Sequence, residues 1–217
     1  MNEQLPQREQ WVRKAALVIG RLALGYLFFT QLFWKMPPTF GCPADFAFTT
    51  ANEEGRLVRT QGLCDWIGVE AVWAERPRRF FVANLDNQGP PEMFVDVSWV
   101  VRLNGLFITN VVMPNIRWFG YVVWLSEAWI FASLFFGLFS RLGALVALGI
   151  SAQLMIGLAG ITSPYEWEWS YHLLVVLSLL MFVFTPGRIW GIDAWLRPRL
   201  QAASARNRLA RFLYWLT

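Results

Sequence analysis

The feature that most constrains this chain is a set of four apolar segments, each about as long as a membrane is thick. The core of a bilayer is roughly 30 Å thick, and about 20 helical residues cross it. Few charges interrupt the segments, which cover residues 15–34, 118–139, 142–162 and 167–185. The sequence therefore predicts an all-α integral membrane protein. Because the turns at 140–141 and 163–166 are short, we expect antiparallel neighbours in a four-helix transmembrane bundle.

The composition excludes several other classes of protein. Hydrophobic residues make up 56% of the chain and charged residues 16%, whereas an ordinary soluble domain has roughly 25% charged residues. The net charge of +4 is not gathered into a basic strip that would suit nucleic acid. With two cysteines, one histidine and neither a CxxC nor an HExxH pattern, the sequence predicts no metal site. The expected partner is the lipid bilayer.

The first apolar segment could be a signal peptide or a retained helix. It is longer than an ordinary signal-peptide core, and Lys35–Pro38 follows in place of a small-residue cleavage site, so we expect a retained helix. Lysines and arginines close to the predicted spans gather in residues 1–14, at Arg141 and in residues 186–217. Both termini should therefore be cytoplasmic, in a multi-pass protein of the cell (inner) membrane. The loop of residues 35–117 is then extracytoplasmic.

This long loop contains both cysteines, Cys42 and Cys64. In an oxidising compartment the two can bridge, which closes a loop of about 22 residues and contributes about 3 kcal/mol in the chain-entropy model. The sequence favours a structural disulfide, because a redox-active pair requires local activation and the neighbouring residues show no sign of it.

Two further segments are too polar to span a membrane and too apolar to lie free in water. Residues 94–112 predict an extracytoplasmic helix that lies along the membrane surface and ends before Pro114. Residues 206–217 combine arginines with leucine, phenylalanine and tryptophan. They predict an amphipathic tail helix on the cytoplasmic side, attracted to anionic lipid.

Polar residues inside the spans predict how the helices meet. Gly149, Gln153 and Gly157 recur every fourth residue, so the glycines can admit a neighbouring backbone and Gln153 can hydrogen-bond across the contact. Glu127 lies about ten residues into its span, where a charge costs roughly 2.5–3.5 kcal/mol. It is either a proton carrier or ligand-binding carboxylate, or a structural acid bonded to another helix. Arg21 lies at a different depth, so we expect it to snorkel or to meet Asp193 or a helix C-terminus.

The other candidate functional residues lie near span ends. His172 is the only histidine and is either a hydrogen-bonded packing residue or a group that exchanges protons with water. Lys35, Arg102 and Arg117 border the outer face and can either gather an anion or be solvated, and the run from Arg76 to Arg79 is expected to be solvated. Trp124 and Trp129 flank Glu127, where they either line a flat pocket for a quinone headgroup or pack in the core.

Several short motifs together resemble the DoxX superfamily, most closely the DoxD-type membrane subunit of thiosulfate:quinone oxidoreductase. The resemblance covers residues of about 100–197 and the first span. Its motifs are Arg21–Gly25, Asn110–Pro114, Ser126–Glu127, Gly137–Leu142, Glu166–Tyr171 and Thr185–Asp193. It implies coupling of two thiosulfates to tetrathionate, quinone as the electron acceptor and a companion protein subunit. Residues 36–90 have no recognisable counterpart.

Two functional hypotheses from different classes follow, with a third less favoured. In the first, the protein is the membrane subunit of a quinone-linked oxidoreductase that acts on thiosulfate or another small sulfur anion at the outer face. Lys35, Arg102 and Arg117 then attract the anion, Trp124 and Trp129 receive the quinone, and Glu127 or His172 handles protons. In the second, the protein is a non-catalytic accessory subunit of a larger respiratory or photosynthetic complex. A transporter is least favoured, since no repeat or broken helix is evident.

Overall fold

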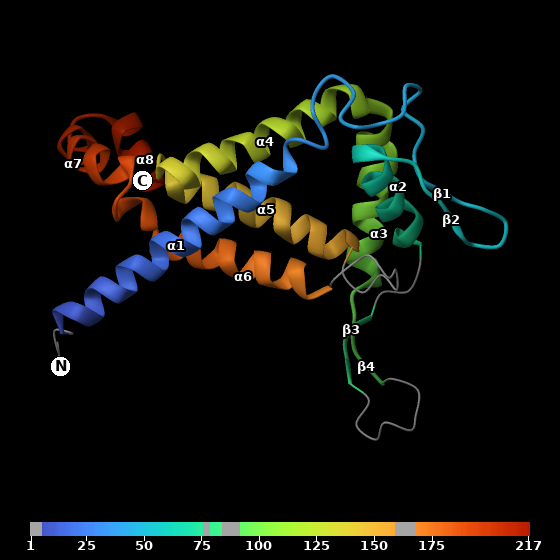
Figure 1. Cartoon of the computed structure of the whole chain (residues 1–217), viewed down its shortest axis with the longest axis horizontal. Coiled ribbons are helices and arrows are strands. Elements are labelled where there is room, and N and C mark those ends of the chain that lie inside the picture. The colour runs from blue at the N-terminus through green and yellow to red at the C-terminus, as the bar shows by residue number, and fades with distance from the viewer. Residues whose placement is uncertain (1–5, 76–78, 84–91, 159–167) are drawn as a thin grey trace. The chain divides into compact units, whose positions relative to one another are not determined.

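The computed structural model describes residues 6–75, 79–83, 92–158 and 168–217 (Figure 1). Helices make up most of this part of the chain, as the sequence predicts. They are α1 (Gln7–Gln31), α2 (Gly62–Ala74), α3 (Ser98–Phe107), α4 (Ile116–Phe136), α5 (Ser140–Leu158), α6 (Glu168–Phe184), α7 (Ile192–Ser204) and α8 (Arg208–Leu216). Two small antiparallel sheets pair β1 (Thr50–Ala51) with β2 (Leu57–Val58) and β3 (Arg79–Ala83) with β4 (Glu92–Asp96).

The chain divides into two compact units, and α4, α5 and α6 each contribute to both. Unit 1 consists of Met1–Phe33, Leu125–Ser151 and Leu173–Thr217. Unit 2 consists of Trp34–Trp124 and Ala152–His172.

One apolar core in unit 1 takes side chains from α1, α4, α5 and α6. The close approach of α1 and α4 depends on Gly25, because a Cβ atom there would lie 3.3 Å from the backbone nitrogen of Phe135. Beside it, the rings of Phe29 and Phe131 are 4.6 Å apart between centroids. The buried members of the core are Leu24, Phe28, Ile130, Leu134, Ala144, Ala147 and Met181. Each of the four helices therefore buries one apolar face in the same core.

Length and apolar composition allow two helices of the described chain to cross a membrane. They are the continuous helical run Ser98–Phe136 and the helix Ser140–Leu158, and Ser170–Phe184 is a shorter apolar helix. The predicted first span, residues 15–34, is helical as far as Gln31, but Arg21 and the polar ends of α1 lower its hydropathy. The predicted span limits at 162 and 167 lie outside the described residues.

The predicted surface helix over residues 94–112 is wrong in its limits. Residues Glu92–Asp96 form strand β4, and α3 begins at Ser98. The helix also continues through Pro114, because a π-helical turn (Ile108–Val112) and a 3-10 turn (Met113–Asn115) join α3 to α4. Pro114 is tolerated because it lies in the first positions of the short 3-10 turn, where a backbone N–H has no helical partner to lose.

Helix α2, which the sequence analysis does not predict, lies within the long loop and packs beside α3 in unit 2 (Figure 1). A Cβ atom at Gly105 of α3 would overlap the side chain of Ala74, so the two helix backbones are in close contact. An apolar core joins the amino-terminal part of α2 to α4 and to the turns before it. Its buried members are Phe40, Cys42, Leu63, Cys64, Ile67, Ile108, Val112 and Ile116.

The carboxyl-terminal helices α7 and α8 pack against each other in unit 1. Arg197 of α7 donates a hydrogen bond to the Tyr214 hydroxyl at 2.7 Å and lies over the Tyr214 ring. Burial, and then the positive charges of Arg197 and Arg141, lower the pKa of the Arg188 guanidinium. Helix α8 exposes the apolar side chains of Leu209, Phe212 and Trp215 as well as the two arginines Arg208 and Arg211, which is the combination expected for the tail.

Candidate functional site

Helix α2 carries a buried acid that the sequence analysis overlooks. Trp66, Glu70 and Trp73 are spaced by four and three residues, so they share one face of the helix. The Glu70 side chain is buried, with 4% of the residue exposed. The signal that could have revealed it is a single acid between two tryptophans on one face of an apolar run.

Two amide side chains hold the Glu70 carboxyl group. Gln153 of α5 donates a hydrogen bond from Nε2 to Glu70 Oε2 at 2.6 Å, and Asn104 of α3 donates one from Nδ2 to the same oxygen at 3.1 Å. A Cβ atom at Gly157 would overlap the carboxyl group. Gln153 and Gly157 therefore act across a helix contact as expected, but the neighbour they contact is α2.

Aromatic and apolar side chains surround the acid. Val69, Leu158 and Tyr171 form a buried cluster, and Trp66, Trp73, Leu154 and Met155 pack against it. The ring of Trp66 lies 6.1 Å from that of Trp34 between centroids, and the ammonium group of Lys35 lies 4.6 Å from the centroid of Trp34. Unit 2 thus holds a buried carboxyl group on the helix face that carries Trp66 and Trp73.

Glu127, the acid that the sequence does single out, lies in the part of α4 that belongs to unit 1, and 3% of it is exposed. Trp124 and Trp129 are both half-buried on this helix. Residues two apart on an α-helix are rotated by about 200°, and residues three apart by about 300°. Trp124 is therefore on the same side of α4 as Glu127, and Trp129 is on the other side.

The remaining predicted residues occupy different environments in unit 2. His172 of α6 is half-buried beside the buried Tyr171. Lys35 is buried, with 6% exposed, whereas Arg102 and Arg117 are exposed. The Arg117 guanidinium lies 5.1 Å from the ring centroid of Phe46. Lys35 and Arg117 thus contact different rings, and Arg76 and Arg78 lie outside the described residues.

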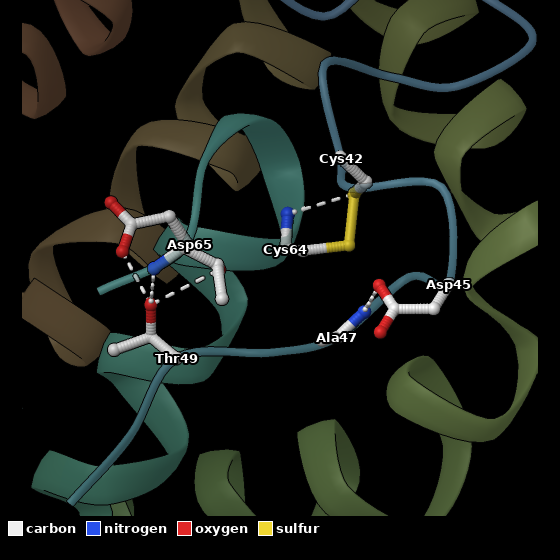
Figure 2. The surroundings of a disulfide bond; sticks show 7 residues. Cys42, Asp45, Ala47, Thr49, Cys64 and Asp65 are labelled. Carbon is white, nitrogen blue, oxygen red and sulfur yellow. Dashed lines mark hydrogen bonds between the residues drawn. A yellow bond between two sulfur atoms is a disulfide. The ribbon is translucent and has the colours of Figure 1, made fainter. Parts of the chain in front are cut away.

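Cys42 and Cys64 are joined by a disulfide with 5.3 Å between the Cα atoms (Figure 2). Exposure of the two residues is 6% and 0%, and the backbone N–H of Cys64 donates to the Cys42 sulfur at 3.1 Å. Nearby, the Thr49 hydroxyl donates to the Asp65 carboxylate (Figure 2), which also accepts a bond from Arg59 Nε at 2.7 Å. The buried disulfide and this polar cluster anchor the first turn of α2, which supports a structural role.

Three of the motifs that resemble the DoxX superfamily meet at one polar centre in unit 1. The Asp193 carboxylate accepts bonds from the backbone N–H groups of Phe139 and Ser140, at 2.7 and 2.8 Å, and thereby caps the start of α5. Arg21 donates to the carbonyl oxygens of Pro186 and Trp190 at 3.5 and 3.4 Å. Arg21 therefore meets the segment leading to Asp193, close to one of the alternatives that the sequence leaves open, and the centre ties α1 to α5 and α7.

The apolar helices that are long enough to cross a membrane suggest a helical membrane protein. The family model described as TQO small subunit DoxD matches residues 101–214. This is more than half of the chain, and the protein therefore belongs to the DoxD family, which confirms the resemblance seen in the sequence. No match was found among curated proteins or among solved structures. The matched region contains Asn104, Glu127 and Gln153, whereas Glu70 and the disulfide lie before it.

Proposed function

We propose that the protein is the membrane subunit of a quinone-linked oxidoreductase that converts thiosulfate to tetrathionate at the outer face. Membership of the DoxD family supports this, because the family is described as the small subunit of such an enzyme. Two thiosulfates yield one tetrathionate and two electrons, and a quinone takes up two electrons and two protons to become a quinol. A companion subunit completes the enzyme.

The proposed topology has four membrane-spanning helices, both termini in the cytoplasm and residues 35–117 on the opposite side. The two long apolar helices and the shorter Ser170–Phe184 support it. So does the core of unit 1, to which α1 contributes as well.

The burial of Glu127 within the family region is the single observation that carries a chemical role for this chain. A carboxyl group with 3% exposure in an apolar helix is costly unless it is used or bonded. In the proposed reaction Glu127, or His172, supplies protons to the quinone, and Trp124 contacts its ring, whereas Trp129 lies on the other side of α4 and takes no part. Lys35, Arg102 and Arg117 attract the thiosulfate dianion.

The test is thiosulfate-dependent quinone reduction by membranes that contain the protein and its co-purifying subunit. Glu127→Gln keeps the shape of the side chain but removes its acid, so quinone reduction should fall by about 100-fold. The matched control is Glu54→Gln, because Glu54 is an exposed acid whose side chain is 68% accessible, and this variant should keep wild-type activity. Wild-type activity in Glu127→Gln would remove the proton role of this residue.

The second candidate, a non-catalytic accessory subunit, is favoured by an apolar stripe on α3. Trp99, Leu103 and Leu106 share one face and are each more than half exposed. Lipid or a partner subunit would cover such a stripe. Purification in mild detergent separates the two functions, since an accessory subunit would form a stable complex whose redox centres are all elsewhere and would bind no quinone by itself.

A further inference from the structure

We propose that helices α7 and α8 together form a binding surface for anionic phospholipids. Exposed arginines of the two helices contact the lipid phosphates, and exposed aromatic side chains insert between the acyl chains. This interaction goes beyond the oxidoreductase reaction and does not depend on it.

The carboxyl-terminal helices carry charge of one sign. Residues 194–217 contain five arginines and no acidic residue. Among the residues that the structure describes, Arg206, Arg208 and Arg211 form no ion pair. A surface with this excess of positive charge is complementary to phosphate groups.

One of the five arginines, Arg197, holds α8 in place rather than facing outward. Besides its bond to the Tyr214 hydroxyl, it donates from Nη1 to the Thr217 carbonyl oxygen at 3.4 Å. Arg188, which lies before α7, donates from Nη2 to the same oxygen at 2.6 Å. These contacts fix α8 against α7, and the other four arginines of the segment remain exposed, namely Arg199, Arg206, Arg208 and Arg211.

Each helix combines arginine with aromatic side chains on one exposed face. On α8, Arg208 comes four residues before Phe212, and Arg211 comes three residues after Arg208 and four before Trp215, so the four side chains share a face. On α7, the guanidinium of Arg199 lies 3.5 Å from the ring centroid of Trp195, one turn earlier. Arginine beside exposed aromatic rings is typical of helices that lie in the headgroup region of a bilayer.

Contacts within unit 1 hold both helices at one end of an apolar helix. Asp193 of α7 accepts from the backbone N–H groups of Phe139 and Ser140 at the start of α5. Arg141, also at the start of α5, donates from Nη1 to the Trp215 carbonyl oxygen of α8 at 3.2 Å. Because α5 is long and apolar enough to cross a membrane, its end lies at the depth of the headgroups. This position favours lipid over a protein in solution as the partner.

The first test titrates the purified chain in mild detergent with phosphatidylglycerol, which is anionic, or phosphatidylcholine, which is zwitterionic. Native mass spectrometry counts the bound lipids, and phosphatidylglycerol should bind more tightly. Arg208→Gln/Arg211→Gln should weaken its binding about 30-fold, from about 5-fold for each arginine. Arg208→Lys/Arg211→Lys keeps the charge and should keep most of the affinity. The control is Arg56→Gln, because the Arg56 side chain is 82% accessible and lies outside α7 and α8, so this variant should bind lipid as the wild type does.

The second test uses the wild-type protein in lipid nanodiscs and so does not depend on the folding of a variant. Backbone hydrogen exchange in α8 should be slower in phosphatidylglycerol than in phosphatidylcholine. High salt should reduce the difference, because it screens exposed charges.

Equal hydrogen exchange of α8 in the two lipids would contradict the proposal. So would a glutamine double variant that binds phosphatidylglycerol as tightly as the wild type. Protection of α8 only by a co-purifying acidic protein would make this surface a protein interface and would likewise overturn the assignment to lipid.

Discussion

At the residue scale, the protein buries two acids, Glu70 and Glu127, which are each less than 5% exposed. The free-energy cost of burying Glu127 is visible in the sequence, because this acid interrupts an apolar span. Burying Glu70 has the same free-energy cost, but its segment is not predicted to span a membrane. Its carboxyl group is held because a glycine and a glutamine stand four residues apart on α5 and face α2.

Substitutions at two glycines of α5, Gly157 and Gly149, test the contact between Glu70 and α5. Gly157→Ala places a methyl group against the Glu70 carboxyl group, so we expect a loss of about 1–3 kcal/mol in the free energy of unfolding. Gly149→Ala is the matched control, since a Cβ atom there has no neighbour within 4 Å. This control should be neutral or slightly stabilising, because alanine favours the helix.

Thermal unfolding in detergent measures both variants. Equal stability of the two alanine variants would contradict the close packing of α2 on α5.

At the scale of elements, the start of α5 makes specific contacts with other segments of unit 1. Helix α5 begins at a left-handed turn whose Gly137 has φ +67°, and Asp193 caps it from the start of α7. A Cβ atom at Gly137 would overlap the guanidinium group of Arg21. The family motifs in unit 1 therefore stabilise the turn between α4 and α5.

Asp193→Asn should destabilise unit 1. The carboxylate accepts from two backbone N–H groups and from the Ser140 hydroxyl at 2.7 Å, and an amide turns one of its acceptors into a donor that faces these groups. We expect a cost of about 2–3 kcal/mol. The control is Asp45→Asn, since Asp45 accepts one bond, from Ala47 at 3.2 Å, in an exposed turn.

Chemical unfolding with a helix-sensitive probe compares these two variants. If Asp193→Asn proves as stable as Asp45→Asn, the capping role of Asp193 is incorrect.

At the scale of the whole molecule, the proposed topology follows from charge and hydropathy. Both cysteines of the chain are in the disulfide, so a single introduced cysteine is the only free thiol. Gln7→Cys and Ala205→Cys should react with an impermeant maleimide only after the cytoplasmic side is opened. Glu54→Cys should react in intact cells, because the proposed topology puts residues 35–117 on the outer side.

Labelling is read by the mass shift of the purified protein. Reaction of all three cysteines from the same side would overturn the four-span topology, while leaving the fold of each unit unaffected.

The helical class, the apolar helices α4 and α5 and the family could all be predicted from the amino-acid sequence. These properties are local: hydropathy and helical period are carried by neighbouring residues, and the family motifs are short. It also indicated Gln153 and Gly157 as contact residues, and it left Asp193 as one of several alternatives for the contact of Arg21.

Which residues those contacts join could not be predicted, because it depends on how distant segments pack. Glu70 and Gln153 are 83 positions apart in the sequence. No local pattern specifies which helix packs against a glycine-lined face. For the same reason, the local sequence pattern predicts neither helix α2 nor the continuation of α3 through Pro114 into α4. Their conformations are set by packing between distant segments, since a short apolar helix or a proline turn is stable only when its neighbours bury it.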